Sequence, residues 1–455
     1  MSADADPGMP RPVAGGSGPT YADVNRDIIR TLEFPSPLYF AGMSLVALLL
    51  ATGILAWTGQ IYYGIGMGGH RAPQMWATYI VNFVFWIGIG HAGTLISAIL
   101  YLFRARWRTS VYRGAEAMTV FAVMTAGLFP VIHVGRMWLP YWLLPYPNQR
   151  YLWPAFRSPL LWDVFAISTY LTISVVFFYV GLIPDIAAVR DGTTGIRRRI
   201  YALLAVGWQG TDRQWRHYRR AYGLFAALAT PLVVSVHSVV SWDFAMALVP
   251  GWHSTLFAPF FVDGAIFSGF AMVLVLLLPM RYFFNLYSYI TERQLDMMGK
   301  LLLVTSLVLS YFYVCEGFVS WYSGEPIERA SYLFKWVGVY APWWWLQIFC
   351  NSVTPLVFFW RRARVHVATL YVVSILVLLG MWLERFNIII PGLAHGFYPY
   401  AFGTYAPSLT EYAILVGSFA WFFILFLGFI KVLPSVSIVE VKETIPHPVR
   451  EGRAH

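Results

Sequence analysis

The stretch FPVIHVGRMW (residues 129–138) ends a long apolar run that begins near Ala115. After an aromatic, proline-rich loop, PLLWD (residues 159–163) opens the next apolar run. One apolar helix therefore ends in a histidine and an arginine, and the following helix begins with an aspartate. If both helices cross a bilayer, we expect His133 and Asp163 to face each other at similar depth near one membrane surface.

The composition of the whole chain is that of a polytopic membrane protein. The 455 residues are 58% hydrophobic and 12% charged, whereas a soluble domain carries about 25% charged residues. Apolar runs recur along the chain, and a run of about 20 residues can cross a bilayer core of about 30 Å. The net charge of +10 does not indicate nucleic-acid binding, because the basic residues lie in short loops between the expected spans.

The N-terminal residues and the cysteines exclude several other features. Residues 1–20 are rich in Pro, Gly and Ala and lack an apolar core, so we interpret them as a disordered tail and not as a signal peptide. The only cysteines, Cys315 and Cys350, lie inside apolar runs without a CxxC motif. We therefore expect no metal site in this chain, neither an iron–sulfur cluster nor a structural zinc.

The apolar runs predict an all-α fold with about ten transmembrane helices. Residues 21–34 precede them and predict a short amphipathic helix at the membrane interface. The ten spans are expected at about 38–58, 76–103, 115–139, 160–184, 221–249, 258–280, 301–322, 340–360, 366–390 and 411–432.

This order predicts three regions. They are a cytoplasmic tail over 1–37, which includes the interfacial helix, a ten-helix membrane domain over 38–432, and a cytoplasmic C-terminal tail over 433–455. Spans 2–5 and 6–9 would form two four-helix bundles in the same orientation, with spans 1 and 10 flanking them. The two halves are too dissimilar in sequence to show an internal repeat.

The distribution of basic residues predicts the orientation. The loops after even-numbered spans carry 18 Lys and Arg residues, against 5 in the loops after odd-numbered spans. Because Lys and Arg concentrate in cytoplasmic loops, both termini are expected in the cytoplasm of a bacterium, with the chain in its inner membrane. His133 and Asp163 would then lie near the periplasmic surface.

Two chemical interpretations of this motif remain open. Pro130 should bend its helix one turn before His133, and Arg136 would share a helix face with His133. A histidine and a carboxylate in such a place could accept the two hydroxyl protons of a quinol. The alternative, equally weighted, is that His133 makes a structural hydrogen bond while Arg136 extends to the interface.

Five further polar residues are candidates for moving protons through the bundles, since ionisable groups inside a bilayer are usually paired or functional. They are His91, His237, Asp243, Asp263 and Glu316. For His91 and His237, interhelical hydrogen bonding is the favoured alternative. Glu384 and Arg385 predict a structural ion pair near the outer surface.

Four features together resemble the NrfD-like family, also called the polysulfide-reductase membrane-subunit family. They are PVIHVGRMW at 130–138, the Asp163 that opens span 4, GHAGTLISAIL at 90–100 and WHSTLFAPFFVDGAIFSGFAMVL at 252–274. The similarity extends over about 35–432. Within the family, ten spans most resemble the ActC-type subunits of alternative complex III.

This resemblance implies a menaquinol site near the periplasmic face of an oxidoreductase subunit that is not active alone. It implies that His133 and Asp163 hold the quinol head group, and Arg136 and Trp138 extend the motif. It also implies that this chain carries no haem or iron–sulfur cluster. Electrons would pass to a periplasmic ferredoxin-like iron–sulfur subunit and then to multihaem cytochrome c subunits, beside a second NrfD-like membrane subunit.

Three other functions compete with this one. A haem-b cytochrome needs paired histidines at matched depth on adjacent helices, and no two histidines recur within one span at a two-haem spacing. A secondary transporter would break its helices at equivalent positions, but Pro130 and Pro231 lie in spans that are not equivalent. A structural membrane anchor, close to ActF-type sister subunits, would not need the pair of His133 and Asp163.

Overall fold

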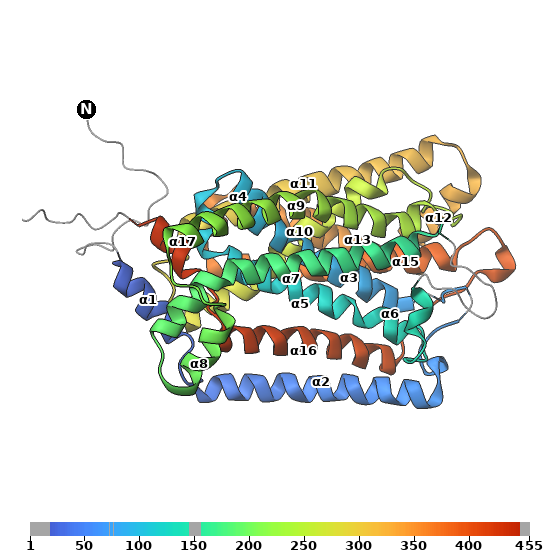
Figure 1. Cartoon of the computed structure of the whole chain (residues 1–455). Coiled ribbons are helices and arrows are strands. Elements are labelled where there is room, and N and C mark those ends of the chain that lie inside the picture. Colours follow the sequence, from blue (N-terminus) through green and yellow to red (C-terminus); the bar gives the residue numbers. More distant parts are fainter. Residues whose placement is uncertain (1–18, 72, 76, 145–155, 446–455) are drawn as a thin grey trace, which may run out of the picture.

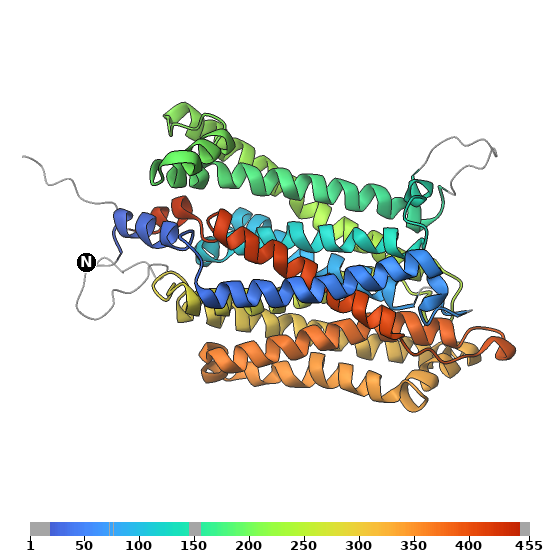
Figure 2. The same cartoon turned by 90° about the horizontal axis from the view of Figure 1, so that it is seen from below.

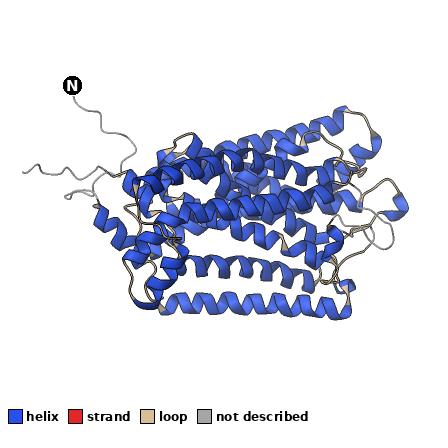
Figure 3. Ribbon diagram, in the orientation of Figure 1, coloured by secondary structure: helices blue, strands red, loops and turns tan. Residues whose placement is uncertain are grey.

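The computed structural model describes residues 19–71, 73–75, 77–144 and 156–445. Every regular element in these segments is helical, and none of these residues lies in a strand (Figure 3). Within the same segments, nine helices are long and apolar enough to cross a membrane. The all-α membrane fold expected from the sequence is confirmed.

Spans 2–5 form the first four-helix bundle. Its helices are α3 (Ala77–Thr94), α5 (Tyr112–Ala126), α7 (Pro159–Asp191) and α9 (Asp212–Ala245). The π-helical η2 (Leu95–Ile99) and α4 (Leu100–Leu102) extend α3, and α6 (Leu128–His133) continues α5. Each helix packs on the next, and α9 returns to α3, which closes the ring.

Spans 6–9 form the second bundle. Three of its members are α10 (Phe257–Phe283), α11 (Glu292–Tyr322) and α15 (Val367–Ala394). The fourth is a broken helix made of α13 (Ala341–Ile348), the π-helical η5 (Phe349–Val353) and the 3-10 helix η6 (Thr354–Phe359). Pro355 cannot donate the amide hydrogen that a continuous α-helix would need there. The broken helix packs between α11 and α15 at the place of the eighth expected span, but it is not among the nine described helices that are long and apolar enough to cross a membrane.

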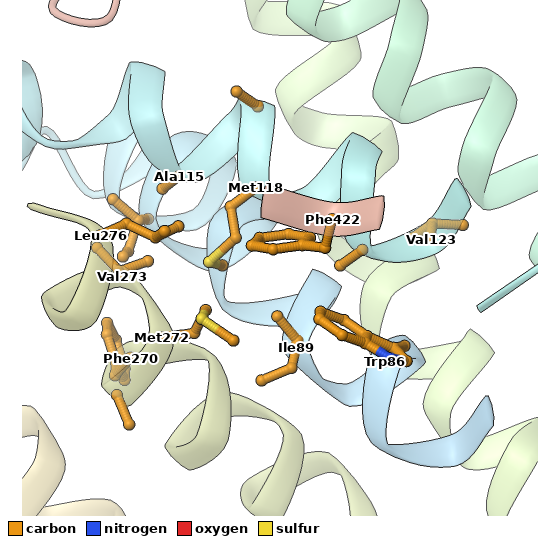
Figure 4. Close-up of a cluster of buried hydrophobic side chains, with 14 of the residues drawn as sticks. Trp86, Ile89, Ala115, Met118, Val123, Phe270, Met272, Val273, Leu276 and Phe422 are labelled. Carbon is orange, nitrogen blue, oxygen red and sulfur yellow. The ribbon is translucent and has the colours of Figure 1, made fainter. Parts of the chain in front are cut away.

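The two bundles share one apolar core. Helix α10 packs on α3 and α9, and α15 also reaches α3. Figure 4 shows part of this core, with Ile89 of α3, Met118 of α5 and Met272 of α10 turned toward one another. The bundles are therefore parts of one packed membrane domain.

Two helices flank the first bundle. They are α2 (Pro37–Tyr63) and α16 (Leu409–Val432), which run side by side (Figures 1 and 2). A Cβ atom on Gly53 would lie 2.6 Å from the Cα atom of Gly417, so the two backbones touch at this crossing. Because α16 packs on α5 while most of α2 is uncovered, α16 attaches α2 to the domain.

Short helices cover the two ends of the bundles (Figure 1). We call the end that carries α1 (Tyr21–Arg30), α8 (Gly195–Leu204) and α17 (Ile438–Glu443) the basic end. The opposite end, which carries α6 and α12 (Pro326–Val337), is called the site end. The remaining short elements are η1 (Ile65–Met67), η3 (Arg106–Ser110), η4 (Pro140–Leu143), α14 (Arg361–Val365) and η7 (Pro399–Ala401).

Both segments that the sequence assigns to tails contain packed residues. The helix expected at 21–34 forms as α1, but Val24 and Ile28 on its apolar face are buried inside the protein. Helix α17 is also packed, with Ile438 fully buried. The described parts of both tails lie at the basic end (Figure 1).

Candidate functional site

His133 is the last residue of α6. The helix is interrupted at Gly127, between α5 and α6, three residues before Pro130. This interruption agrees with the predicted bend. The prediction that Arg136 continues the same helix face is wrong, because the helix ends at His133 and Gly135 adopts φ = 78°. A left-handed residue ends an α-helix.

The His133 ring lies beside a second histidine that the sequence analysis did not select. The ring centroids of His133 and His70 are 6.4 Å apart, and His70 packs on Tyr79 at 4.9 Å. Within the described part of the chain, Nδ1 of His133 and both ring nitrogens of His70 are buried without a hydrogen-bond partner. Because a neutral imidazole has one basic nitrogen and one N–H group, the two rings bring at most two basic nitrogen atoms together.

A fully buried glutamine fixes α6 in place. Gln60 of α2 donates its Nε2 hydrogen to the carbonyl of Ile132 at 3.2 Å and accepts a hydrogen bond from the Tyr79 hydroxyl. One side chain therefore joins α2, α3 and the last turn of α6. Because Ile132 precedes His133 directly, these contacts set the position of the histidine.

Glu411 at the start of α16 holds the segment that carries His70. Its carboxylate accepts hydrogen bonds from the Gly69 amide at 2.7 Å, from the Thr78 hydroxyl at 3.0 Å and from the Tyr405 hydroxyl. Burial lowers the pKa of His70 below its ordinary value, and the negative charge of Glu411 opposes this shift. A buried imidazole with a lowered pKa stays neutral, so it can accept a proton.

Asp163 lies in the first turns of α7 and is paired with Asp243 near the end of α9. The two side chains are 5% and 8% exposed, and their carboxyl groups are close enough to interact electrostatically. In the described structure no N–H or O–H group donates to either oxygen of Asp163, so the pair has free acceptor positions.

The structure does not place His133 and Asp163 in direct contact. Among the described residues, His133 faces His70, whereas Asp163 faces Asp243. Both lie on helices that reach the site end of the first bundle. The two residues that extend the motif, Arg136 and Trp138, are exposed to the surroundings.

Two of the candidate proton carriers meet in the first bundle. The rings of His91 and His237 are 4.5 Å apart, and His91 also stacks on Tyr170 at 5.1 Å. His91 Nδ1 contacts the Ile87 carbonyl at 2.6 Å, while both nitrogens of His237 lack a partner among the described residues.

Two candidates, Asp263 and Glu316, lie in the second bundle. Asp263 lies close enough to Glu384 to interact with its charge, and one Asp263 oxygen is buried without a partner in the described structure. Glu384 forms an ion pair with Arg385 at 2.5 Å and accepts a hydrogen bond from Tyr313. The predicted pairing of Glu384 with Arg385 is confirmed.

Glu316 has two partners on α12 that the sequence analysis missed. Its carboxylate lies near Tyr332 and close enough to Lys335 to interact with its charge. Lys335 is 2% exposed and its ammonium lies 4.9 Å from the Tyr332 ring centroid. Burial lowers the pKa of Lys335 and the carboxylate of Glu316 opposes that change. Helix α12 follows span 7 after a short turn. The sequence feature that could have indicated a partner for Glu316 was Lys335, a basic residue within this short helix.

A buried ionic network of the described residues lies at the basic end. Arg113, fully buried, donates to Glu116 and to Asp185, each at 2.8 Å. Nearby, Arg108 pairs with Glu440 of α17 at 2.8 Å. Both arginines were expected to be exposed charges in the loop between spans 2 and 3. The spacing of three residues between Arg113 and Glu116, at the start of a span, could have indicated a buried pair.

Comparison with known proteins assigns the family. Residues 66–395 match the model of the family described as polysulphide reductase, NrfD. A putative membrane subunit of dimethyl sulfoxide reductase from Halobacterium salinarum is 25% identical over 411 residues, which cover 82% of this chain and 86% of the relative. An Hdr-like menaquinol oxidoreductase integral membrane subunit from Archaeoglobus fulgidus is 24% identical over 445 residues, covering 91% and 98%. A subunit of selenate reductase from Mesobacillus selenatarsenatis is 22% identical over 249 residues, covering 52% and 55%. The match to the family model spans most of the chain and coincides with the two helical bundles, so this protein belongs to the NrfD family.

Proposed function

We propose that this chain is the quinol-binding membrane subunit of a respiratory or photosynthetic redox complex and that it oxidises menaquinol at the site end of the first bundle. The observation that carries the proposal is the set of buried, unpartnered proton acceptors there: Nδ1 of His133 and both oxygens of Asp163. Buried polar groups normally have partners. Acceptors that lack partners within the described chain are suited to a ligand with hydroxyl groups.

The residues present fit a quinol. A bound menaquinol supplies two electrons and two protons. His133 would accept a hydroxyl proton at Nδ1, with His70 as a second neutral base beside it. Asp163 would accept the other proton and share it with Asp243. Gln60 and Glu411 would act as positioning residues, because they fix the backbone of α6 and of the segment carrying His70.

The partner that receives the electrons follows from the resemblance to known complexes. We propose a periplasmic ferredoxin-like iron–sulfur subunit, followed by multihaem cytochrome c subunits, beside a second NrfD-like membrane subunit as in alternative complex III. The names of the relatives, among them a menaquinol oxidoreductase subunit, support a redox assembly. The excess of basic residues in the even-numbered loops supports a bacterial inner-membrane location with both termini in the cytoplasm.

A route for protons through the bundles extends this proposal. His91 and His237 would carry protons in the first bundle, while Asp263 and Glu316 would do so in the second. The ring contact between the two histidines and the unpartnered atoms of His237 and Asp263 support this role. Reconstituted complex should then release more than the two protons of each quinol to the outside. Release of two protons or fewer would contradict the route but not the quinol site.

The quinol site is tested by single substitutions in the assembled complex. Asp163→Asn and His133→Ala should each lower the rate of menaquinol-driven reduction of the partner subunits by at least about 100-fold, the usual contribution of a general base. Asp191→Asn, at the other end of the same helix, and the exposed His217→Ala are matched controls that should keep the rate. If all four variants assemble and react like the wild type, the quinol site lies elsewhere and the chain acts as a structural anchor.

A further inference from the structure

Helix α8 exposes an apolar stripe. Ile196, Ile200 and Leu203 follow one another at spacings of four and three residues, which places them on one side of the helix. Their side chains are 76%, 52% and 80% exposed. The opposite side faces the protein, because Tyr201 and Ala205 are buried. A short helix with such a stripe on its free side is amphipathic in the sense of a membrane-surface helix.

The contacts of α8 place it at the level where two spans end. Arg197 donates to the carbonyl of Leu32 at 2.8 Å, five residues before α2 begins at Pro37. Tyr201 donates to the carbonyl of Val432 at 2.7 Å, the last residue of α16. The helix therefore lies beside the points at which α2 and α16 leave the apolar layer.

The end of α8 also folds back along α7. The Tyr179 hydroxyl donates to the Leu204 carbonyl at 2.8 Å. Tyr179 lies twelve residues before the end of α7, or about 18 Å at 1.5 Å per residue. Because α7 has 33 residues and extends well beyond a bilayer core of about 30 Å, this contact returns α8 toward the membrane.

Charge accompanies the stripe. Arg198 and Arg199 are exposed, and at 100° per residue Arg199 lies beside the stripe, about 60° from Ile196. The neighbouring first turns of α9 add further exposed arginines, namely Arg213, Arg216, Arg219 and Arg220. No acidic side chain lies within α8 to offset these charges.

We propose that α8 lies in the membrane interface, with its apolar stripe among the acyl chains and Arg199 on the phosphates of anionic lipids. We assign a lipid surface to this face for three reasons. The stripe is apolar, a basic residue flanks it, and α8 lies beside the ends of two spans. The same amphipathic pattern in α1 has another outcome, since Val24 and Ile28 are covered by the protein. Interfacial anchoring is thus assigned to α8, which the sequence analysis counted only as a basic loop.

Site-specific quenching tests this placement in the full-length protein. A bimane on Leu203→Cys is compared with one on Ala202→Cys, an exposed neighbour 100° away on the polar side, both in a Cys315→Ser background. In nanodiscs of phosphatidylcholine with phosphatidylglycerol, doxyl-labelled lipid should quench the label at 203 severalfold more than the label at 202. Equal quenching at the two positions, or protection of 203 from both lipid and aqueous quenchers by a partner protein, would overturn the proposal.

The charge component has its own readout. Each arginine near an anionic surface should enrich phosphatidylglycerol by about five-fold, so doxyl-phosphatidylglycerol should quench position 203 more than doxyl-phosphatidylcholine does. Arg199→Gln should lower this preference while the excess of quenching at 203 over 202 persists, whereas Arg198→Gln, on the side of the helix opposite the stripe, should leave the preference unchanged. A wild-type protein without any lipid preference, or a preference unchanged in Arg199→Gln, would refute the anionic-lipid site.

Discussion

Replacing Arg113 by methionine should destabilise the protein strongly, although Arg113 lies far from the proposed quinol site. Its guanidinium donates to Glu116 and Asp185 at 2.8 Å each, to the Gly181 carbonyl at 2.8 Å and to the Tyr112 hydroxyl at 3.0 Å. Removing one partner of a buried ion pair leaves an uncompensated charge and costs about 3–5 kcal/mol. Here two carboxylates lose the same partner, so we expect the upper part of that range.

The loss can be measured by denaturant-induced unfolding of the purified protein in detergent. Arg26→Met serves as the control, because this arginine is exposed and its ion pair with Asp23 should contribute nothing measurable. The triple variant Arg113→Met, Glu116→Gln, Asp185→Asn removes all three charges and should recover at least half of the lost stability. An Arg113→Met protein as stable as the wild type, or a triple variant less stable than the single one, would refute the electrostatic reasoning.

Three further predictions concern other contacts. Gly53→Leu should cost about 1–3 kcal/mol, because its side chain would collide with Gly417 at the α2–α16 crossing, whereas Gly42→Leu has open space and should be neutral in the same unfolding assay. Burial lowers the pKa of His70 from 6.5, so His70 resists protonation in the folded protein, which loses stability as the pH falls below about 6.5. His70→Gln should therefore flatten the profile of melting temperature from pH 7 to pH 5, and an unchanged slope would contradict this. Lys335→Met should destabilise the protein because it leaves Glu316 without its cation, and adding Glu316→Gln should restore stability. The double-mutant cycle should give a coupling of at least about 1 kcal/mol, whereas strict additivity would show that the two charges do not interact.

Much of the fold follows from hydropathy because the bilayer imposes its length on every crossing. The apolar runs predicted ten crossings and two bundles. The described structure contains the two bundles and nine helices that are long and apolar enough to cross a membrane. The interruption of the eighth span at η5 and η6 was missed, since a broken helix has the same composition as a continuous one. The surroundings of the apolar faces of α1 and α8 were not predicted, for a related reason. Amphipathicity indicates that one face is covered, but tertiary packing decides whether protein or lipid covers it.

The candidate site was predicted less completely. Spacing along the chain located His133 and Asp163 at helix ends, yet each has a nearer partner, His70 and Asp243 respectively. His70 lies in a short connection outside any apolar run, where hydropathy gives no indication of burial. The partner of Asp163 lies 80 residues away on α9, and only the closure of the bundle brings the two helices together.

Photoaffinity labelling with an azido-quinone tests the central claim most directly, because it reports where the head group binds without requiring turnover. We predict that label competed by excess menaquinone appears on peptides that contain His133 or Asp163, and that Asp163→Asn and His133→Ala reduce it. Competed label confined to α11 and α12 of the second bundle, with none on these peptides, would contradict a quinol site at the site end of the first bundle.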